Sequence, residues 1–234
     1  MTERKVAIVT AAGRGIGAAC ARELWERGYS LSLMSVSENA VQLAEELGGL
    51  GLQGSVTNKA DLKTLVDKTF ERYGHIDAVV NNTGHPAKGD LLQLTDEQWY
   101  EGFNLIVLSV VHMAQLITPI MFKQGGGAIV NISSYAAVEP SLGRPVSSTI
   151  RAALDSFTKL YADRYAQNNI RMNCILPGFI DNYPVDNDIF AAIPMQRQAK
   201  LTEIAKTVAF LLSADAGYIT GQNLRVDGGL TRSL

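Results

Sequence analysis

Apolar positions follow two different periods that alternate along the chain. Residues 5–10 form a short β-branched run that stops at glycines, and residues 15–28 place apolar side chains at helical spacing. The same pattern predicts strands at 30–35, about 52–55, 76–84 with a glycine turn at its end, within 125–134, at 170–175 and at 223–229. It predicts helices at 39–48, 58–74, about 98–123, 147–166 and 202–213, with Thr95 and Gln98 forming a capping box before the helix at 98–123.

This alternation indicates the fold class. Near-continuous apolar strands separated by amphipathic helices are typical of an α/β protein, in which helices cover both faces of a parallel sheet. No repeat, low-complexity tract or linker interrupts the pattern, so residues 1–234 are predicted to form one doubly wound, Rossmann-type domain. Ligands of such sheets bind at the carboxyl ends of the strands.

Composition narrows the choice of partners and compartment. A formal charge of −2 gives no basic field for nucleic acid. The longest apolar run, near 105–113, is broken by Ser109 and His112, so no membrane contact is expected. Cys20 and Cys174 each lie among apolar residues, which suits a reducing cytoplasm. His75 and His112 have no partners at metal-ligand spacing, so no metal site is expected.

The segment "VTAAGRGIGAAC" joins the first predicted strand to the first helix. Gly13, Gly15 and Gly17 let the backbone approach a pyrophosphate closely, and the helix N-terminus offers free N–H groups and a partial positive charge. The spacing differs from the common Gly-x-Gly-x-x-Gly fingerprint, and a tight turn without a ligand has the same composition. Its position after the first strand of an alternating fold favours the ligand.

Other segments share a pattern with this turn. They include "NNTG" (81–84), "NISS" ending at Ser134, "IRMN", "PGFID" (177–181) and "TGQNLRVDGG". Together they resemble the short-chain dehydrogenase/reductase family, whose Thr-Gly-x-x-x-Gly-x-Gly pattern is matched at 10–17 except for Ala11. The resemblance covers nearly the whole chain and implies a nicotinamide cofactor. The expected cofactor contacts are Thr10, Gly13, Arg14, Gly15, Ile16, Gly17, Ser35, Ser37, Val56, Asn82, Gly84, Pro177, Gly178 and Ile180.

The end of the second strand bears on the choice of nicotinamide. An acidic residue there would bind the 2′-hydroxyl of NAD, whereas a nearby arginine accommodates the 2′-phosphate of NADP. The chain offers the hydroxyls of Ser35 and Ser37, with Arg14 on the glycine-rich turn. Glu38 is the counter-evidence, although it is predicted to open the next helix. NADP(H) is therefore favoured over NAD(H).

The resemblance also implies a catalytic set of asparagine, serine, tyrosine and lysine. Asn104 and Ser134 match the first two. At the usual spacing from Ser134, the chain places Ser147 in the tyrosine position and Arg151 in the lysine position. An aliphatic hydroxyl is a much weaker acid than a phenol, whose pKa is about 10, and an arginine stays charged. The standard proton transfer is not available from these two residues.

Three other proton sources are open. Tyr135 follows Ser134, but in an extended segment its side chain would point the opposite way. His85 has a suitable reference pKa, and a loop histidine without a role is its plainer interpretation. A water held by Ser134 and Ser147 is the third source. Tyr183 lies in the loop expected to cover the substrate, where a tyrosine usually only packs, so it is not counted as a source.

Three functions fit these residues. The first is a nicotinamide-dependent oxidoreductase of a carbonyl or alcohol substrate with altered proton transfer. The second is a catalytically silent NADP(H)-binding protein, acting as a sensor or as a partner subunit. The third is another chemistry in the same pocket, such as reduction of an activated double bond or a lyase step.

The same resemblance implies the size of the substrate pocket and the oligomeric state of the protein. A short substrate lid is expected at about 181–192, with a modest and open pocket for a small-molecule substrate. The two long helices, about 98–123 and 147–166, and the C-terminal strand predict a homo-oligomer, either a tetramer or a dimer. No charge constellation in the lid or pocket is readable from the sequence, so the substrate is left open.

Overall fold

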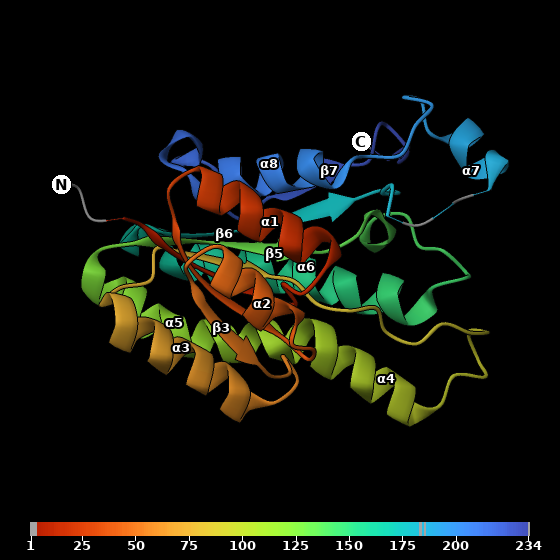
Figure 1. Ribbon diagram of the computed structural model, residues 1–234. Coiled ribbons are helices and arrows are strands. Elements are labelled where there is room, and N and C mark those ends of the chain that lie inside the picture. The colour runs from red at the N-terminus through yellow and green to blue at the C-terminus, as the bar shows by residue number, and fades with distance from the viewer. Residues whose placement is uncertain (1–3, 183, 185, 234) are drawn as a thin grey trace.

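The computed structural model describes residues 4–182, 184 and 186–233. Seven strands form one sheet in the order β3-β2-β1-β4-β5-β6-β7, and every neighbouring pair is parallel. The predicted doubly wound, Rossmann-type fold is therefore confirmed (Figure 1). The strands are β1 Val6–Thr10, β2 Ser30–Ser35, β3 Leu50–Gln53, β4 Ala78–Asn81, β5 Gly127–Ile132, β6 Ile170–Pro177 and β7 Asn223–Val226.

Helices cover both faces of this sheet, because its central strands are apolar on both sides. Ala7 and Val9 of β1 pack into the core under α1, α2 and α8, whereas Ile8 packs into the core under α3 and α5. The helices are α1 Gly15–Glu26, α2 Asn39–Glu46, α3 Lys59–Tyr73, α4 Asp96–Phe103, α5 Ser109–Gln124, α6 Pro145–Tyr165, α7 Asn187–Ala192 and α8 Leu201–Leu212.

Local signals explain the helix ends. Thr95 and Gln98 form the predicted capping box, with Thr95 Oγ1 accepting from the Gln98 N–H at 3.3 Å. Gly74 ends α3 in the left-handed region with φ 79°. Among the boundaries that differ from the prediction, β3 begins at Leu50, and α6 begins at Pro145, a residue that suits the first turn of a helix.

The helix predicted at about 98–123 lies within the stretch Asp96–Gln124, which contains a π-helical turn, η1 Asn104–Leu108. By length and composition it is apolar enough to cross a membrane. Within this fold, however, Ile106, Met113 and Ile117 are fully buried in the protein core. The stretch therefore has the contacts of a core helix.

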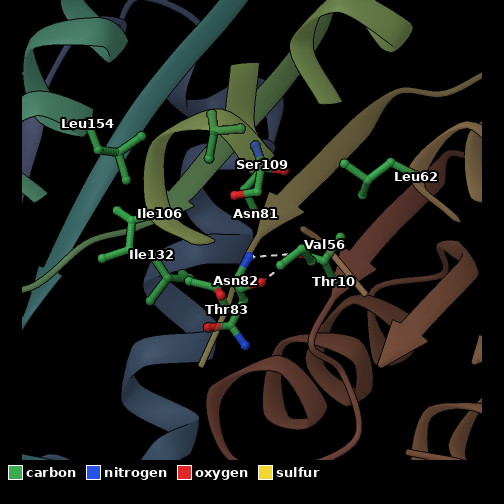
Figure 2. A pocket seen from close by; sticks show the side chains of 11 residues that line it. Thr10, Val56, Leu62, Asn81, Asn82, Thr83, Ile106, Ser109, Ile132 and Leu154 are labelled. Carbon is green, nitrogen blue, oxygen red and sulfur yellow. Dashed lines mark hydrogen bonds between the residues drawn. The ribbon is translucent and has the colours of Figure 1, made fainter. Parts of the chain in front are cut away.

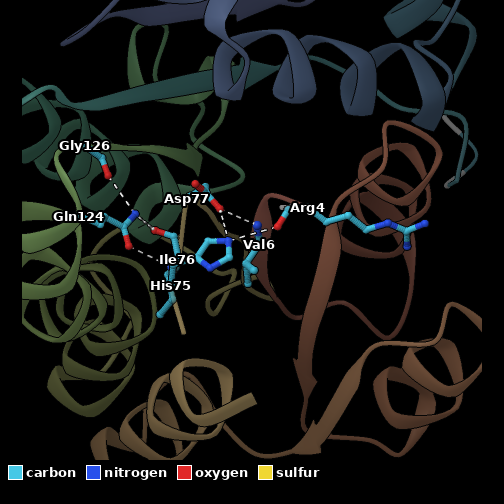
Figure 3. Close-up of polar contacts among 7 residues, drawn as sticks. All are labelled: Arg4, Val6, His75, Ile76, Asp77, Gln124 and Gly126. Carbon is cyan, nitrogen blue, oxygen red and sulfur yellow. Dashed lines mark hydrogen bonds and ion pairs between the residues drawn. The ribbon is translucent and has the colours of Figure 1, made fainter. Parts of the chain in front are cut away.

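The amino-terminal edge of the sheet is closed by polar contacts (Figure 3). Asp77 Oδ2 accepts the Val6 N–H at 2.7 Å and lies 3.2 Å from Nε2 of His75. The Gln124 amide accepts from the Ile76 N–H at 3.2 Å and donates to the Ile76 carbonyl at 2.7 Å. Buried backbone groups at this edge are thus paired with side chains of the chain itself.

Candidate functional site

The opposite, carboxyl-terminal edge has a crevice where the strand order reverses between β1 and β4. Thr10 at the end of β1 and Asn82 just after β4 lock its two sides together. Thr10 Oγ1 donates to the Asn82 carbonyl at 2.7 Å and accepts the Asn82 N–H at 3.0 Å (Figure 2). The Thr10 side chain and the Asn82 backbone therefore hold the crevice in shape, and the Asn82 side chain donates to the Ala11 carbonyl at 3.2 Å.

The glycine-rich turn is packed tightly against this lock. A Cβ on Gly17 would lie 2.3 Å from the Ala11 carbonyl oxygen and 2.8 Å from Nδ2 of Asn82, so only glycine fits. Gly15 has φ 57°. Ala11, in the position where the family pattern has glycine, also has φ 45°, a conformation that costs an L-residue about 1–2 kcal/mol. The turn keeps the glycine-like backbone even where the glycine is absent.

The N-terminus of α1 opens into the crevice without a cap. Arg14 occupies the N-cap position and makes no side-chain cap hydrogen bond, and the first turn contains no acidic residue. Uncapped N–H groups together with the helix dipole favour an anion. The turn of Gly13 to Gly17 therefore fits the pyrophosphate of a dinucleotide, with Ile16 in the first turn.

The end of β2 borders the same turn. A Cβ on Gly13 would lie 2.8 Å from Ser35 Oγ and 3.2 Å from Ser37 Oγ, so both hydroxyls lie against the loop. Ser35 Oγ donates to the Ser37 carbonyl at 2.7 Å, which leaves the exposed Ser37 hydroxyl and Arg14 as the open polar groups. Glu38 is the N-cap residue of α2, as predicted.

A small cavity extends the crevice beside β4 (Figure 2). Val56, Asn82 and Thr83 line it together with Leu62. Oγ1 of Thr83 is buried with no hydrogen-bond partner among the described residues, which is unusual for a buried hydroxyl. Thr83 was missed in the sequence, since an isolated threonine in "NNTG" carries no signal. The next residue, Gly84, has open space around it.

The end of β6 forms the other wall. A Cβ on Gly178 would lie 2.9 Å from Cα of Asp227, so glycine allows the segment after Pro177 to pack on the end of β7. Ile180 bridges to Ala199, and its carbonyl accepts from Gln198 Nε2 at 2.7 Å. All fourteen residues expected to contact the cofactor thus lie along this edge, and its uncapped helix and close-packed glycines fit a nicotinamide dinucleotide.

Ser147 and Arg151 are one turn apart on α6, and they contact each other. Arg151 Nε donates to Ser147 Oγ at 3.2 Å, and Arg151 Nη1 donates to the Ile132 carbonyl at 2.6 Å. Arg151 is 5% exposed. Because Ser147 Oγ accepts from the guanidinium, its own hydrogen is left to donate to another group.

Asp155, one further turn along α6, compensates the buried charge of Arg151. Ser133 Oγ donates to Asp155 Oδ1 at 2.8 Å. Burial lowers the pKa of Arg151 to about 10 and raises the pKa of Asp155 to about 6, and the attraction between the two opposes both shifts. Arg151 therefore stays charged near neutral pH. The i, i+4 spacing was the signal that the sequence offered for Asp155.

Asn104 and Ser134 lie at irregular points of the backbone. Asn104 begins the π-helical turn, and its carbonyl accepts the Ser109 N–H. π-Turns recur at functional sites. Ser134 precedes a short 3₁₀ helix, η2 Tyr135–Ala137, and its Oγ accepts the Ala136 N–H at 3.3 Å. Both side chains are half-buried.

Tyr135 differs from its predicted setting. Ser134 is extended but Tyr135 is not, because η2 begins there, so the argument from an extended segment does not apply to the Tyr135 side chain. Its ring packs on Phe179, with 5.5 Å between ring centroids. Phe179 lies in the 177–180 segment, so Tyr135 contacts the wall of the crevice.

His85 follows β4 at the same edge. Partial burial lowers the pKa of His85, and the positive charges of Arg151, Arg144, Lys88 and Arg14 lower it further. Its imidazole is therefore mainly neutral at pH 7 and a poor acid. The expectation that no charge constellation marks the pocket was wrong, because four cations from three separate segments act on His85.

The predicted lid is described in part. Asp181 and Asn182 are exposed, and α7 contains no fully buried residue. Gly15 lies close to Asn182, because a Cβ on that glycine would be 3.5 Å from Asn182 Nδ2. Tyr183 lies outside the described residues. The segment therefore passes over the glycine-rich turn.

Comparison with known proteins decides the family. The family described as "Enoyl-(Acyl carrier protein) reductase" matches residues 10–231. The 3-oxoacyl-[acyl-carrier-protein] reductase FabG of Haemophilus influenzae is 36% identical over 236 residues, which cover 97% of this chain and 98% of that protein. The chain belongs to the short-chain dehydrogenase/reductase family. The predicted resemblance is thereby confirmed for the family.

Two further relatives agree. FabG of Escherichia coli is 34% identical over 238 residues, covering 97% of this chain and 98% of that protein. The crystal structure of YwfH, described as an NADPH dependent reductase involved in bacilysin biosynthesis, superimposes with a TM-score of 0.93 at 26% identity. It covers 99% of this chain and 100% of that one. The chain is thus a short-chain dehydrogenase/reductase-type member of a family of NAD(P)-dependent reductases.

Proposed function

We propose that this protein is an NADP(H)-dependent oxidoreductase acting on a carbonyl or alcohol substrate with altered proton transfer. The uncapped N-terminus of α1, bordered by Arg14 and the hydroxyl of Ser37, is the observation that supports it most strongly. A phosphate at that position gains the helix dipole and a guanidinium. FabG and YwfH, as relatives, are reductases, and YwfH is described as NADPH dependent.

When bound, the cofactor supplies the hydride. The chain orients the substrate, because Ser134 and Ser147 hydrogen-bond the substrate oxygen. Arg151 fixes the Ser147 hydroxyl by donating a hydrogen bond to its Oγ. Because the Arg151 guanidinium donates to Ser147 Oγ, the Ser147 hydrogen is free to point at a developing negative charge. A general acid is worth about 10²–10⁴-fold, so a site without one near the right pKa is a slow carbonyl reductase.

The proton comes from Tyr135 or from water held by Ser134 and Ser147. The contact of Tyr135 with Phe179 favours the tyrosine over His85, whose lowered pKa leaves little imidazolium to donate. Tyr135→Phe separates the two sources. It keeps the ring packing, and a large loss of turnover with unchanged cofactor affinity would assign the proton to Tyr135.

A second candidate is reduction of a double bond conjugated to a carbonyl. Hydride addition to the β-carbon places negative charge on the carbonyl oxygen, and water can protonate the α-carbon afterwards, so no strong acid is needed beside the oxygen. A hydroxyl supported by a fixed cation, as in Ser147 and Arg151, suits this charge. The description of the matching family, an enoyl reductase, agrees.

The deciding experiment measures NADPH and NADH oxidation with paired ketones, 3-oxoacyl thioesters and matching enones or enoyl thioesters. It compares the natural protein with Ser147→Tyr/Arg151→Lys. Ketone turnover by the natural protein, at or below the rate of the double variant, supports the proposal. Turnover of the unsaturated substrates alone favours the second candidate. NADPH binding without turnover, rescued in the double variant, would make the protein a silent NADP(H)-binding protein, either a sensor or a partner subunit.

The same proposal includes a cytoplasmic homo-oligomer. Exposed apolar side chains on the outer helices, Phe122 of α5 and Leu160 of α6, suit a contact with a second copy. The buried free thiols Cys20 and Cys174 suit a reducing compartment. Light scattering of the eluting protein distinguishes a tetramer, a dimer and a monomer.

A further inference from the structure

Four cations meet at the carboxyl-terminal edge, and we call Arg14, Lys88, Arg144 and Arg151 the cationic cluster. Their charges all act on His85, so segments after β1, after β4 and at the start of α6 converge there. Arg14, Lys88 and Arg144 form no ion pair among the described residues. Several cations elsewhere do: Arg22 with Glu46, Arg27 with Glu23, and Arg197 with Glu203.

The nearby carboxylates are engaged by other groups. Asp155 lies beneath Arg151 and accepts from Ser133. Asp90, two residues from Lys88, accepts the Leu92 N–H at 3.2 Å. Glu139, five residues before Arg144, accepts backbone N–H groups of the C-terminal segment. None of these three carboxylates forms an ion pair with Arg14, Lys88 or Arg144 among the described residues, so the three cations stay open to an added anion.

Arg144 is the member of the cluster placed to meet a substrate. It is the N-cap residue of α6, so it directly precedes the first turn of the helix, which carries Ser147. Its guanidinium carbon lies 5.6 Å from the ring centroid of Phe179, the residue that also packs on Tyr135. An aromatic support fixes the plane of the guanidinium and leaves its N–H edge open.

We propose that the substrate carries its own carboxylate and that Arg144 binds it, with Lys88 adding charge from the facing loop. This inference rests on the proposed reductase function. A guanidinium fork matches the two oxygens of a carboxylate, which favours this anion over a rounder one. Arg144 and Ser147 are about 4.5 Å apart along the helix axis, so the carboxylate lies close to the reacting carbon. A compact oxo acid or unsaturated acid is the expected substrate class.

The test compares short acids with their methyl esters as matched substrates in NADPH oxidation. The natural protein is expected to favour the acids by at least tenfold in kcat/KM. Arg144→Met keeps an unbranched apolar stem against Phe179 and removes the charge, so it should raise KM for the acids about tenfold or more and leave the esters unchanged. Arg144→Lys should recover part of the preference, because it restores the charge without the fork.

The control is Arg164→Met. Arg164 lies in the last turn of the same helix and covers the Tyr165 ring at 5.4 Å, so it repeats the arginine–aromatic contact away from the crevice. Loss of the acid preference in Arg144→Met but not in Arg164→Met supports the proposal. Equal loss in both variants, or ester turnover equal to acid turnover in the natural protein, overturns it.

A binding measurement tests this inference separately from the reductase proposal. Titration calorimetry of NADP⁺-loaded protein uses a short oxo acid, its hydroxy acid and inorganic phosphate. Binding of the acids that is lost in Arg144→Met supports the carboxylate site even if no substrate turns over, in which case the reductase proposal fails alone. Turnover of neutral ketones without acid binding, or tighter binding of phosphate than of the acids, overturns the carboxylate site and leaves the reductase proposal intact.

Discussion

The amino-terminal and carboxyl-terminal edges of the sheet, where the strands begin and end, differ in whether their polar groups have partners within the chain. At the amino-terminal edge, Asp77 and Gln124 satisfy the backbone groups of Val6 and Ile76. At the carboxyl-terminal edge, the first turn of α1 has no cap and Thr83 Oγ1 has no partner among the described residues. The amino-terminal edge pairs its own polar groups, whereas the carboxyl-terminal edge leaves N–H groups and a hydroxyl that a bound ligand would pair.

Glycines show the same difference. Gly74, which ends α3 near the amino-terminal edge, has a positive φ but nothing within 4 Å of an added Cβ. Gly17 and Gly178 at the carboxyl-terminal edge have ordinary φ values and backbone within 3 Å of an added Cβ. The first kind of glycine serves the conformation of a turn. The second serves close approach of chain segments, which a ligand crevice requires.

The largest expected effect is the loss of cofactor binding in Gly17→Ala. Its Cβ would lie 2.3 Å from the Ala11 carbonyl, so the turn must move away from the Asn82 lock. We expect NADPH affinity to fall at least about 100-fold, which corresponds to about 3 kcal/mol. Fluorescence titration with NADPH measures it.

Gly74→Ala is the matched control from the other edge. It strains only a positive φ, so we expect a loss of about 1 kcal/mol of unfolding free energy with unchanged NADPH affinity. If Gly17→Ala bound NADPH like the natural protein, the close-packed glycines would not shape a cofactor site, and the contrast between the edges would fail.

The second effect concerns the buried pair of Arg151 and Asp155. The pKa of Asp155 is raised to about 6, above that of an unfolded aspartate, so the folded state holds this proton more tightly. The contribution of Asp155 to stability is therefore present below about pH 4 and is lost as pH rises to about 6. The loss is at most about 3 kcal/mol.

Asp155→Asn should remove this dependence. Urea unfolding at several pH values from 4 to 7 gives the difference in unfolding free energy between the natural protein and the variant. That difference should fall as pH rises and then level off above about pH 6. A difference that does not change with pH would show that Asp155 titrates normally and that burial does not penalise its charge.

Local signals made most of this fold predictable, and long-range packing limited the rest. The period of apolar residues located the seven strands, and glycine spacing located the turn after Thr10, because both signals lie within a few consecutive residues. The π-turn at Asn104 was missed, since residues 104–108 keep helical apolar spacing and carry no local mark of the change. Boundaries at β3 and α6 shifted by two residues for the same reason.

The cationic cluster could not be predicted, because its members are distant in the sequence. His85, on which the cluster acts, and the members Lys88 and Arg144 are each ordinary loop or helix-end residues in the sequence, up to 59 positions apart. They meet only because the ends of β4 and β5 lead to the same edge of a parallel sheet. The contact of Tyr135 with Phe179 is another long-range feature, because the two residues are 44 positions apart in the sequence.

A third prediction compares the effect of one positive charge at each edge on cofactor affinity. Arg14→Ala removes the cation beside Ser37, so NADPH affinity should fall about tenfold, or about 1.4 kcal/mol, with NADH affinity nearly unchanged. Arg4→Ala, a cation at the amino-terminal edge, should alter neither. Equal weakening for both cofactors would place Arg14 on the pyrophosphate and remove the main support for NADP(H).

The smallest loss of stability or function is expected from Asp77→Ala at the amino-terminal edge. The Val6 N–H loses its acceptor, and an unsatisfied buried N–H costs about 1–3 kcal/mol. Because the Asp77 side chain is partly exposed, water can replace it, and a loss of about 1 kcal/mol is expected. Thermal unfolding measures this loss, and NADPH affinity and turnover should stay unchanged, since the affected groups lie at the far end of the strands. A change in cofactor affinity without a change in stability would show that the two edges are coupled through β1, whose other end carries Thr10.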